Sequence, residues 1–345
     1  MATACIPQVT FEFHDKLKPV VARFDHAQAS TDGGVVLLKA LDDRLGMTDQ
    51  LAACLIDRRD PDKIRHSMRD LLRQRIFGLA CGYEDANDAA RLADDPLHKL
   101  AVGRDPVIGA ALASQPTLSR FEHAMSPRAL YRASRTLAAT VIAHHRARLN
   151  GRAQRITIDL DPTDDPTHGQ QELTFFNGHY DAWCYLPLVA TLTFNDEVEQ
   201  YLVAIVLRPG NSSAKRGASG LLRSLVRCLR RAFPEATLRV RVDGGFAGND
   251  WLEVLETQRV EYVVGVASNA RLVQRAGRLL GEAYGLSKYS GHTEHVYGDT
   301  LYAAGSWSRI KPLTWPISSS PSTRSPSNMP FLARARPSTS FSSST

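Results

Sequence analysis

The sequence predicts an α/β protein, in which a mixed β-sheet flanked by helices follows a mainly helical N-terminal region and precedes a disordered tail. Three observations lead to this fold class. Apolar residues recur at helical spacing up to about residue 150, short β-rich runs follow, and the text after residue 309 is crowded with Ser and Pro. The predicted regions are therefore 1–150, 151–309 and 310–345.

The composition is that of a globular protein with an excess of basic residues. The 345 residues are 43% hydrophobic, enough for two domains, and carry a formal net charge of +6. No apolar run approaches the roughly 20 residues that span a bilayer, and no signal peptide is recognised, so we expect a cytoplasmic protein without a membrane partner. The five cysteines form no C-x-x-C pair, which argues against structural zinc and a disulfide framework. The basic balance favours a polyanionic partner.

Two helices stand out in the N-terminal region. The first begins after Ser67, a residue type that caps helices, and stops near Gly82. The second runs over 127–148. Its apolar positions, expected on the buried side, are Leu130, Leu137, Val141 and Ile142. Arg69 and Arg73 fall largely off the apolar stripe of the first helix, which leaves two interpretations open: contacts to a nucleic-acid backbone, or a solvated surface.

Short strands and helices are predicted between residues 151 and 309. Strands over 155–161, 185–194 and 200–207 come first; a helix over 217–233, a strand over 237–243, a helix over 249–258, a strand over 261–267 and a helix through 280 follow. Three successive strands followed by alternating helices and strands are typical of an RNase H-like domain. In such a sheet the first and fourth strands lie side by side.

Acidic residues end both of those strands. Asp159 and Asp161 alternate with apolar residues and so share one face of the first strand. A buried carboxylate is costly without a cation or donor, so this pair indicates either a metal site or merely a frayed strand end. The fourth strand favours the metal site, because it also ends in an acid, Asp243, before Gly244 and Gly245. Asp161 and Asp243 together suit Mg²⁺, which prefers oxygen ligands.

Around these acids the sequence resembles the DDE transposases of bacterial insertion sequences, over most of residues 10–309. The first similar block covers 159–172, 175–181 and 185–188, and the second covers 241–247 and 262–272. Blocks of this length are far more specific than a lone pair of aspartates.

The resemblance implies an RNase H-like catalytic domain that cuts and joins DNA with Mg²⁺ or Mn²⁺. It assigns Asp161 to the first catalytic acid and Asp243 to the second, both as metal ligands, with Asp159 as the alternative for the first. The implied partner is DNA, as the terminal repeats of an element and as target DNA; self-association is left open. Lys215 and Arg216 lie in a predicted loop before a helix, which is either a phosphate contact or simply a flexible connection.

The third acid of the family is missing from its expected place. In the family it is a Glu in the pattern Tyr-x2-Arg-x3-Glu-x6-Lys, whereas here the similarity continues through the stretch from Tyr302 to Arg309 and then stops. Residues 310–345 contain no Asp or Glu. We hypothesise that a shifted reading frame produced this tail, and we expect transposition to be impaired. Two alternatives remain: an inactive DNA-binding remnant that inhibits an intact transposase, and a metal nuclease that needs only two carboxylates.

Overall fold

The computed structural model describes residues 8–11, 20–23, 32–267, 269–305, 307, 310–319 and 331–335. The chain forms two compact units, Met1–Thr140 and Val141–Thr345. The boundary between them falls inside the long helix α7 (Pro127–Arg148), which occupies the range predicted for it.

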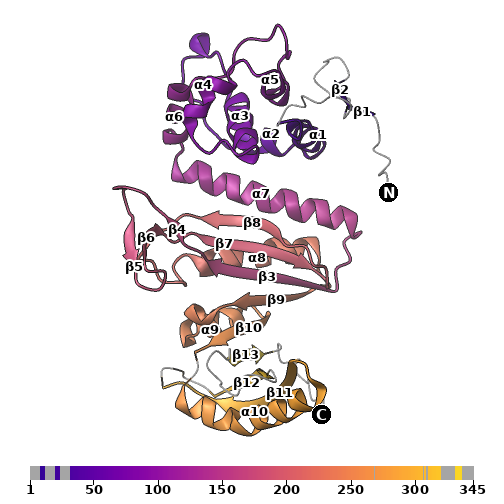
Figure 1. Ribbon diagram of the computed structural model, residues 1–345, viewed down its shortest axis with the longest axis vertical. Coiled ribbons are helices and arrows are strands. Elements are labelled where there is room, and N and C mark those ends of the chain that lie inside the picture. Colours follow the sequence, from indigo (N-terminus) through magenta and orange to yellow (C-terminus); the bar gives the residue numbers. More distant parts are fainter. Residues whose placement is uncertain are drawn as a thin grey trace, which may run out of the picture. The chain divides into compact units, whose positions relative to one another are not determined.

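The first unit is mainly helical, as the sequence predicts (Figure 1). It opens with a two-stranded antiparallel sheet, β1 (Gln8–Phe11) and β2 (Val20–Arg23). The helices that follow are α1 (Val35–Leu45), α2 (Met47–Ala52), α3 (Met68–Ala80), α4 (Ala89–Leu92), α5 (Pro96–Val102) and α6 (Gln115–His123), with short 3-10 turns η1 (Pro61–Lys63) and η2 (Ala86–Asp88).

Helix α3 is central to this unit because it contributes to two apolar clusters. Ser67 caps its start, where Ser67 Oγ accepts the backbone N–H of Asp70 at 3.0 Å. Phe77 packs with residues of α1 and α5, and Leu71 packs with residues of α4 and α6. After the helix ends, Gly82 takes a φ of +90°, a conformation that favours glycine.

Two side chains in this unit depart from the sequence prediction. Arg73, considered as a DNA contact, is only 2% exposed. Its Nε donates to Thr48 Oγ1 at 2.8 Å and to Asp42 Oδ2 at 3.1 Å. Its positive charge is therefore compensated inside the unit and does not face DNA. Leu130, expected to be buried, is 54% exposed, because the neighbouring Ala129 faces the core instead.

The second unit is built on a mixed sheet with the strand order β11-β12-β13-β10-β9-β3-β7-β8. Its strands are β3 (Arg155–Pro162), β7 (Leu188–Phe194), β8 (Tyr201–Val206), β9 (Thr237–Val242), β10 (Glu261–Val266), β11 (Glu294–Tyr302), β12 (Lys311–Ser319) and β13 (Phe331–Ala335). Strands β3, β7 and β8 are antiparallel neighbours, and β9 and β10 run parallel to β3. This is the predicted RNase H-like arrangement, with the first and fourth strands of the domain side by side.

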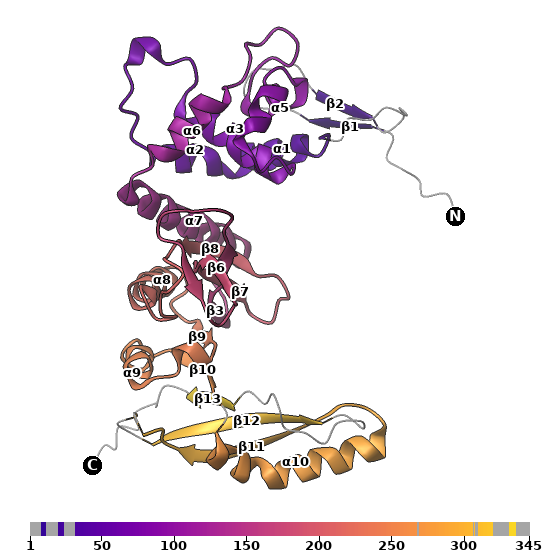
Figure 2. The same ribbon diagram turned by 60° about the vertical axis from the view of Figure 1, so that its left-hand side comes forward.

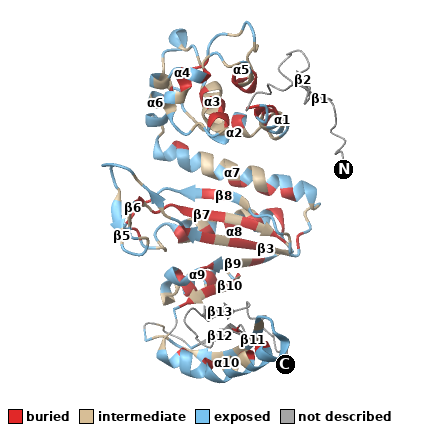
Figure 3. Ribbon diagram, in the orientation of Figure 1, coloured by how far each residue is buried: buried red, intermediate tan, exposed pale blue. Residues whose placement is uncertain are grey.

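Helices α8 (Ala218–Ala232) and α9 (Asn249–Thr257) cover one face of this sheet (Figure 2). They bury large apolar side chains such as Leu222, Leu229 and Trp251, each at most 2% exposed. The strand residues Ile156 and Ile158 are fully buried too, and Figure 3 shows the buried stretches continuing along β3 and β7. Each such side chain contributes about 1.5–3 kcal/mol to stability, which makes this sheet a firm support for what lies at its edge.

A small second sheet, with the order β4-β6-β5, is inserted between β3 and β7. It consists of β4 (Asp165–Pro166), β5 (Phe175–Asn177) and β6 (Ala182–Tyr185). The single strand predicted over 185–194 is thus two strands, which belong to different sheets. Gly210 packs against this insertion so closely that a Cβ there would lie 2.1 Å from the carbonyl oxygen of Cys184.

Two strands occur in the stretch that was predicted to be disordered. Strand β12 pairs with β11 along its whole length, and β13 pairs with β10. Leu313, Trp315 and Ile317 alternate along β12, a strand pattern that the surrounding Ser and Pro residues obscure. The rest of the tail, 320–330 and 336–345, lies outside the described residues.

Helix α10 (Ala270–Ser290) extends beyond the predicted limit of residue 280 and ends where Gly291 takes a φ of +76°. None of the helices in the described part of the chain combines the length and the apolar character needed to cross a membrane.

Candidate active site

Asp161 and Asp243 lie together at the carboxyl ends of two adjacent parallel strands. The register of β3 and β9 pairs Asp159 with Arg241 and Leu160 with Val242, so Asp161 and Asp243 follow at the same level. Neighbouring strands are about 4.8 Å apart, and alternation places both carboxylates on the face shared with Asp159 and Arg241.

The electrostatics of Asp161 reflect this proximity. Its pKa is raised from the ordinary value, first by partial burial and then by the negative charges of Asp243 and Asp159. Like charges held together at a sheet edge repel each other, and a bound cation would relieve that repulsion. The pair therefore has the charge that a divalent cation site requires.

Close backbone packing holds Asp243 in place. Its Oδ1 accepts the backbone N–H of Gly245 at 3.1 Å, which starts the 3-10 turn η3 (Gly244–Phe246). On the other side, β10 passes so near that a Cβ at Gly265 would lie 2.9 Å from the backbone nitrogen of Gly244 and 3.2 Å from the carbonyl carbon of Asp243. Only glycine at position 265 permits this approach.

Asp159 has a different partner. Arg241 donates to its two carboxylate oxygens, from Nε at 2.6 Å and from Nη2 at 2.9 Å. This bidentate hydrogen bond raises the pKa of Arg241, as expected when a guanidinium gains a carboxylate. Because Arg241 neutralises Asp159, the alternative that Asp159 is the first metal ligand is not favoured. Arg241 itself escaped the sequence prediction, although it lies two residues before Asp243 and faces the same side.

Tyr180 is a second residue that the sequence prediction missed. It comes from the turn between β5 and β6, and its hydroxyl donates to the carbonyl oxygen of Pro162 at 3.2 Å. Burial raises its pKa, and the charges of Asp161, Asp164 and Asp243 raise it further. The phenol therefore stays protonated beside the two acids. Its only signal in the sequence is its place in the first block of similarity.

The loop that carries Lys215 and Arg216 lies next to the second acid. A Cβ at Gly245 would be 2.9 Å from the Cβ of Ala214, so the loop packs against the turn that follows Asp243. Lys215 Nζ is 2.7 Å from Asp250 Oδ1, and Arg216 Nη1 lies 3.5 Å from Ser212 Oγ. Lys215 is therefore partly neutralised, whereas Arg216 has no ion-pair partner among the described residues.

Arg208 is the buried support of this loop. It is 4% exposed, and its Nη1 donates to the carbonyl oxygens of Ser213, Ala214 and Arg216. Its Nε donates to the carbonyl oxygen of Leu186 at 2.8 Å, which ties the loop to the segment between β6 and β7.

A row of arginines follows on the exposed face of α8. These residues are Arg223, Arg227, Arg230 and Arg231, and the helix contains no acidic residue. With Gln258 and Val226 they line a hollow of about 380 Å³. The spacing i, i+4, i+7 and i+8 was readable in the sequence as a basic stripe. Arg69 of the first unit is half exposed and lies 3.5 Å from Asp49.

The two acids fit a hard divalent cation, and Asp159, the other carboxylate on this face, is already engaged by Arg241. No group of three His, Cys, Asp or Glu residues suited to a metal is found in the part of the chain that the structure describes. Mg²⁺ is nevertheless often held by one or two carboxylates, with waters and phosphate oxygens completing the shell.

Comparison with known proteins bears on both units. The family model described as transposase DDE domain, group 1, matches residues 13–315, so the match includes the helical unit and ends within β12. No curated protein matches the chain.

Proposed function

This chain belongs to the DDE transposase family, and on that premise we propose that it binds DNA and holds one divalent cation, Mg²⁺ or Mn²⁺, between Asp161 and Asp243. The family reaction implied is metal-assisted hydrolysis of DNA at the ends of a mobile element. The freed 3'-hydroxyl then attacks target DNA, without a covalent enzyme intermediate.

The observation that carries this proposal is the placement of two carboxylates at one level on adjacent parallel strands, where burial and then the charge of Asp243 raise the pKa of Asp161. When bound, the cation would polarise the scissile phosphate and lower the pKa of an attacking water. Asp161 and Asp243 would orient it, and the Tyr180 hydroxyl, which donates to the carbonyl oxygen of Pro162, helps to hold the strand end that carries Asp161.

Basic groups near the acids support DNA as the partner. Arg216 lies in the loop beside Asp243, and the arginines of α8 continue from that loop along an exposed face. Arginine suits phosphate oxygens because its planar guanidinium donates two parallel hydrogen bonds. Lys215, Arg216 and Arg69 remain proposed DNA contacts, and the buried Arg73 does not.

The missing third acid favours weak turnover. With two carboxylates the cation is held loosely, so we propose binding of metal and DNA with severely impaired strand transfer. The same observation supports the alternative of an inactive remnant, which occupies the ends of an element and inhibits an intact transposase. A nuclease that needs only two carboxylates is the remaining alternative.

One set of assays separates these proposals. DNA carrying the two ends of the encoding element is incubated with the full chain and Mg²⁺ or Mn²⁺, and cleavage, joining and gel-shift binding are measured. In parallel, Mn²⁺ binding is followed by electron paramagnetic resonance, which does not require turnover. Asp243→Ala should abolish both Mn²⁺ binding and any cleavage, whereas Glu199→Gln, at an exposed acid away from the site, should change neither.

Each result has a definite meaning. Binding of DNA without cleavage supports the remnant, and cleavage without joining supports the nuclease. Efficient joining would overturn the claim that the lost acid matters. Mn²⁺ binding that survives Asp243→Ala would overturn the assignment of the cation site.

A further inference from the structure

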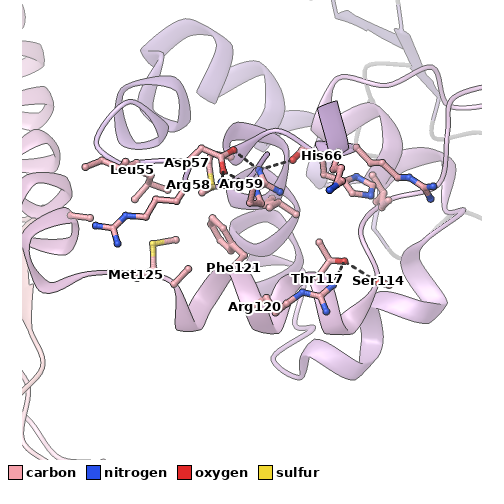
Figure 4. Close-up of a pocket in the computed structure, with 18 of the residues that line it drawn as sticks. Leu55, Asp57, Arg58, Arg59, His66, Ser114, Thr117, Arg120, Phe121 and Met125 are labelled. Carbon is pink, nitrogen blue, oxygen red and sulfur yellow. Dashed lines mark hydrogen bonds and ion pairs between the residues drawn. The ribbon is translucent and has the colours of Figure 1, made fainter. Parts of the chain in front are cut away.

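A cavity of about 1120 Å³ lies within the first unit (Figure 4). It opens between the segment 55–66, helix α3, the segment 110–114 and helix α6. A cavity of this size, at the upper end of the roughly 300–1000 Å³ of small-molecule sites, has room for several linked groups of a polymer.

The floor of the cavity is apolar. Leu71 and Phe121, which belong to one core cluster, form its base, and Leu55, Met68 and Met125 pack against that cluster. Figure 4 shows Phe121 and Met125 projecting into the cavity from α6 and from the segment after it. A floor of this kind can contact a flat apolar surface but adds nothing to the binding of a bare phosphate.

The walls of the cavity are strongly basic. Six cationic residues line it, Arg58, Arg59, Lys63, Arg65, Arg104 and Arg120, against one acidic residue, Asp57. Asp57 is already satisfied, because Arg59 donates to it from Nε at 2.8 Å and from Nη2 at 2.6 Å. The hydrogen bond from Arg59 also lowers the pKa of Asp57, which keeps that pair ionised.

The other cations differ in how far they are neutralised. Lys63 lies 3.2 Å from Asp60, and Arg104 lies 3.4 Å from Asp70. Arg58, Arg65 and Arg120 are exposed, and within the described residues no carboxylate forms an ion pair with them. Uncompensated positive charge therefore remains on two of the segments that line the cavity, the segment 55–66 and helix α6.

His66 makes one wall rigid without adding charge. Its Nδ1 accepts from Arg104 Nη2 at 2.8 Å, and its carbonyl oxygen accepts from Arg59 Nη2 at 3.0 Å. Burial and the charge of Arg104 lower the pKa of His66, so the ring is neutral at physiological pH. Arg104 also donates from Nη1 to the carbonyl oxygen of Ala110 at 3.1 Å, which joins two walls.

We propose that this cavity binds a single strand of DNA, with phosphates on Arg58, Arg65 and Arg120 and an unpaired base against the apolar floor. Basic grooves with an apolar platform are the usual means of holding single-stranded nucleic acid. In a duplex the bases are stacked and paired, so they could not reach such a floor. The proposal rests on the proposed function only in taking DNA as the partner.

The test uses the full chain in EDTA, so that no cleavage occurs, and fluorescence anisotropy with three labelled probes. These are a twelve-nucleotide oligo-dT, the same length of abasic strand, and a twelve-base-pair duplex. We expect Arg58→Glu and Arg65→Glu each to weaken oligo-dT binding by about tenfold, the scale of one lost charge-assisted hydrogen bond. Arg44→Glu, an equal charge change at an exposed residue of α1 outside the cavity, should change it less than about twofold.

Comparing the probes on the unsubstituted chain distinguishes single-stranded DNA from other occupants, and this comparison does not depend on whether a variant folds. Oligo-dT should bind more tightly than the abasic strand, because only its bases reach the floor; equal affinity would overturn the assignment. An equal loss for the duplex and the single strand in Arg58→Glu would overturn it as well. Displacement of oligo-dT from the cavity by a glutamate-rich peptide of higher affinity would show an acidic protein segment to be the occupant instead.

Failure here and failure of the proposed function are distinguishable. If Arg58→Glu and Arg65→Glu leave oligo-dT binding unchanged while Mn²⁺ binding depends on Asp243, only the cavity proposal is overturned. If Mn²⁺ binding does not depend on Asp243 while oligo-dT binding depends on Arg58 and Arg65, the cavity proposal stands alone. Circular dichroism and thermal unfolding of each variant show whether it remains folded.

Discussion

The position of Asp243 depends on Gly265, a residue that has no side chain to take part in metal binding. Gly265 lies on the neighbouring strand, and any side chain there would meet the backbone at Asp243 and Gly244. Glycine at position 265 therefore helps to set the position of Asp243, because a side chain there would push the backbone of Asp243 and Gly244 away.

Gly265→Ala should therefore displace Asp243. We expect a loss of about 1–3 kcal/mol in the free energy of unfolding, typical of overpacking, and at least about tenfold weaker Mn²⁺ binding. Urea unfolding and Mn²⁺ titration measure the two effects. Gly277→Ala in α10, where an added Cβ meets open space, is the matched control and should not weaken Mn²⁺ binding. Unchanged Mn²⁺ affinity in Gly265→Ala would contradict this account.

The ionised carboxylate of Asp161 should lower the stability of the metal-free chain, although it strengthens the binding of the cation. Its folded pKa is raised, so the folded chain binds more protons than the unfolded chain between the ordinary value of 3.8 and the raised value. As pH rises through that window the ionised carboxylate costs stability, and this cost persists at neutral pH. Asp161→Asn should therefore unfold at a higher temperature than wild type when no metal is present.

Added Mn²⁺ should reverse that order at neutral pH. Wild type gains stability by binding the cation, and Asp161→Asn should gain little. Thermal melts with and without Mn²⁺ provide the measurement. A variant that is destabilised without metal would show that Asp161 has a structural role rather than the one proposed.

At the scale of elements, a buried histidine attaches the end of α7 to the sheet. The ring of His145 stacks on Phe194 with centroids 4.3 Å apart, and Arg148 Nε donates to its Nδ1 at 3.1 Å. Burial, then the charge of Arg148, lowers its pKa to about 4. Folding therefore excludes the protonated form.

Stability should fall as pH falls from the ordinary pKa of 6.5 towards 4, because the unfolded chain takes up a proton that the folded chain refuses. The loss between pH 7 and pH 5 should be about 2 kcal/mol. His145→Phe keeps an aromatic ring but cannot titrate, so its stability should depend less on pH by that amount. Urea unfolding at several pH values measures this. If the free energy of unfolding changes with pH by the same amount in wild type and variant, this role of His145 is refuted.

The arginine row of α8 is a second property of an element. Four cations without an acid on one helix repel each other, and a phosphate backbone along that face offsets the repulsion. Arg227→Glu should weaken duplex binding and lower the slope of log K against log salt by about 1 to 2. Arg152→Glu, at an exposed loop position of the same unit, provides the control, and an equal effect there would mean that only net charge matters.

At the scale of the whole molecule, the sequence prediction and the structure differ in the C-terminal stretch, residues 310–345. A disordered tail can be removed without cost, whereas strands β12 and β13 lie inside the sheet, between β11 and β10. Removing residues 310–345 should therefore lower the unfolding temperature and cause aggregation through the freed edges. Size-exclusion chromatography and thermal melts of the shortened chain test this, and unchanged behaviour would favour disorder.

The origin of that stretch has its own test. If a shifted reading frame produced it, another frame of the gene should encode Tyr-x2-Arg-x3-Glu soon after codon 309. A gene without this pattern in any frame rules the hypothesis out. Expressing the restored frame should recover joining of DNA, if the lost acid is what limits turnover.

Much of the fold could be predicted because the signals are local. Each element is recognised from a short stretch of sequence, as the alternation along β3 and β9 and the capping residue of α3 show. The order of the elements then follows from their positions in the chain. The split of the segment 185–194 into β6 and β7 could not be predicted in this way, because both halves look like strands and only their partners differ. The strand character of β12 was likewise hidden until its pairing with β11 was known.

By itself, then, the sequence determined that Asp161 and Asp243 end strands of one RNase H-like sheet, and that no acid follows in residues 310–345. Only the tertiary structure decided which charged side chains of the chain are free to contact a metal ion or DNA. Arg241 neutralises Asp159, and Arg73 is buried against Asp42, whereas Arg58 is exposed at a cavity. The reason is physical: a charge is available only if no partner reaches it, and partners come from residues that are distant in the chain but neighbours in the fold.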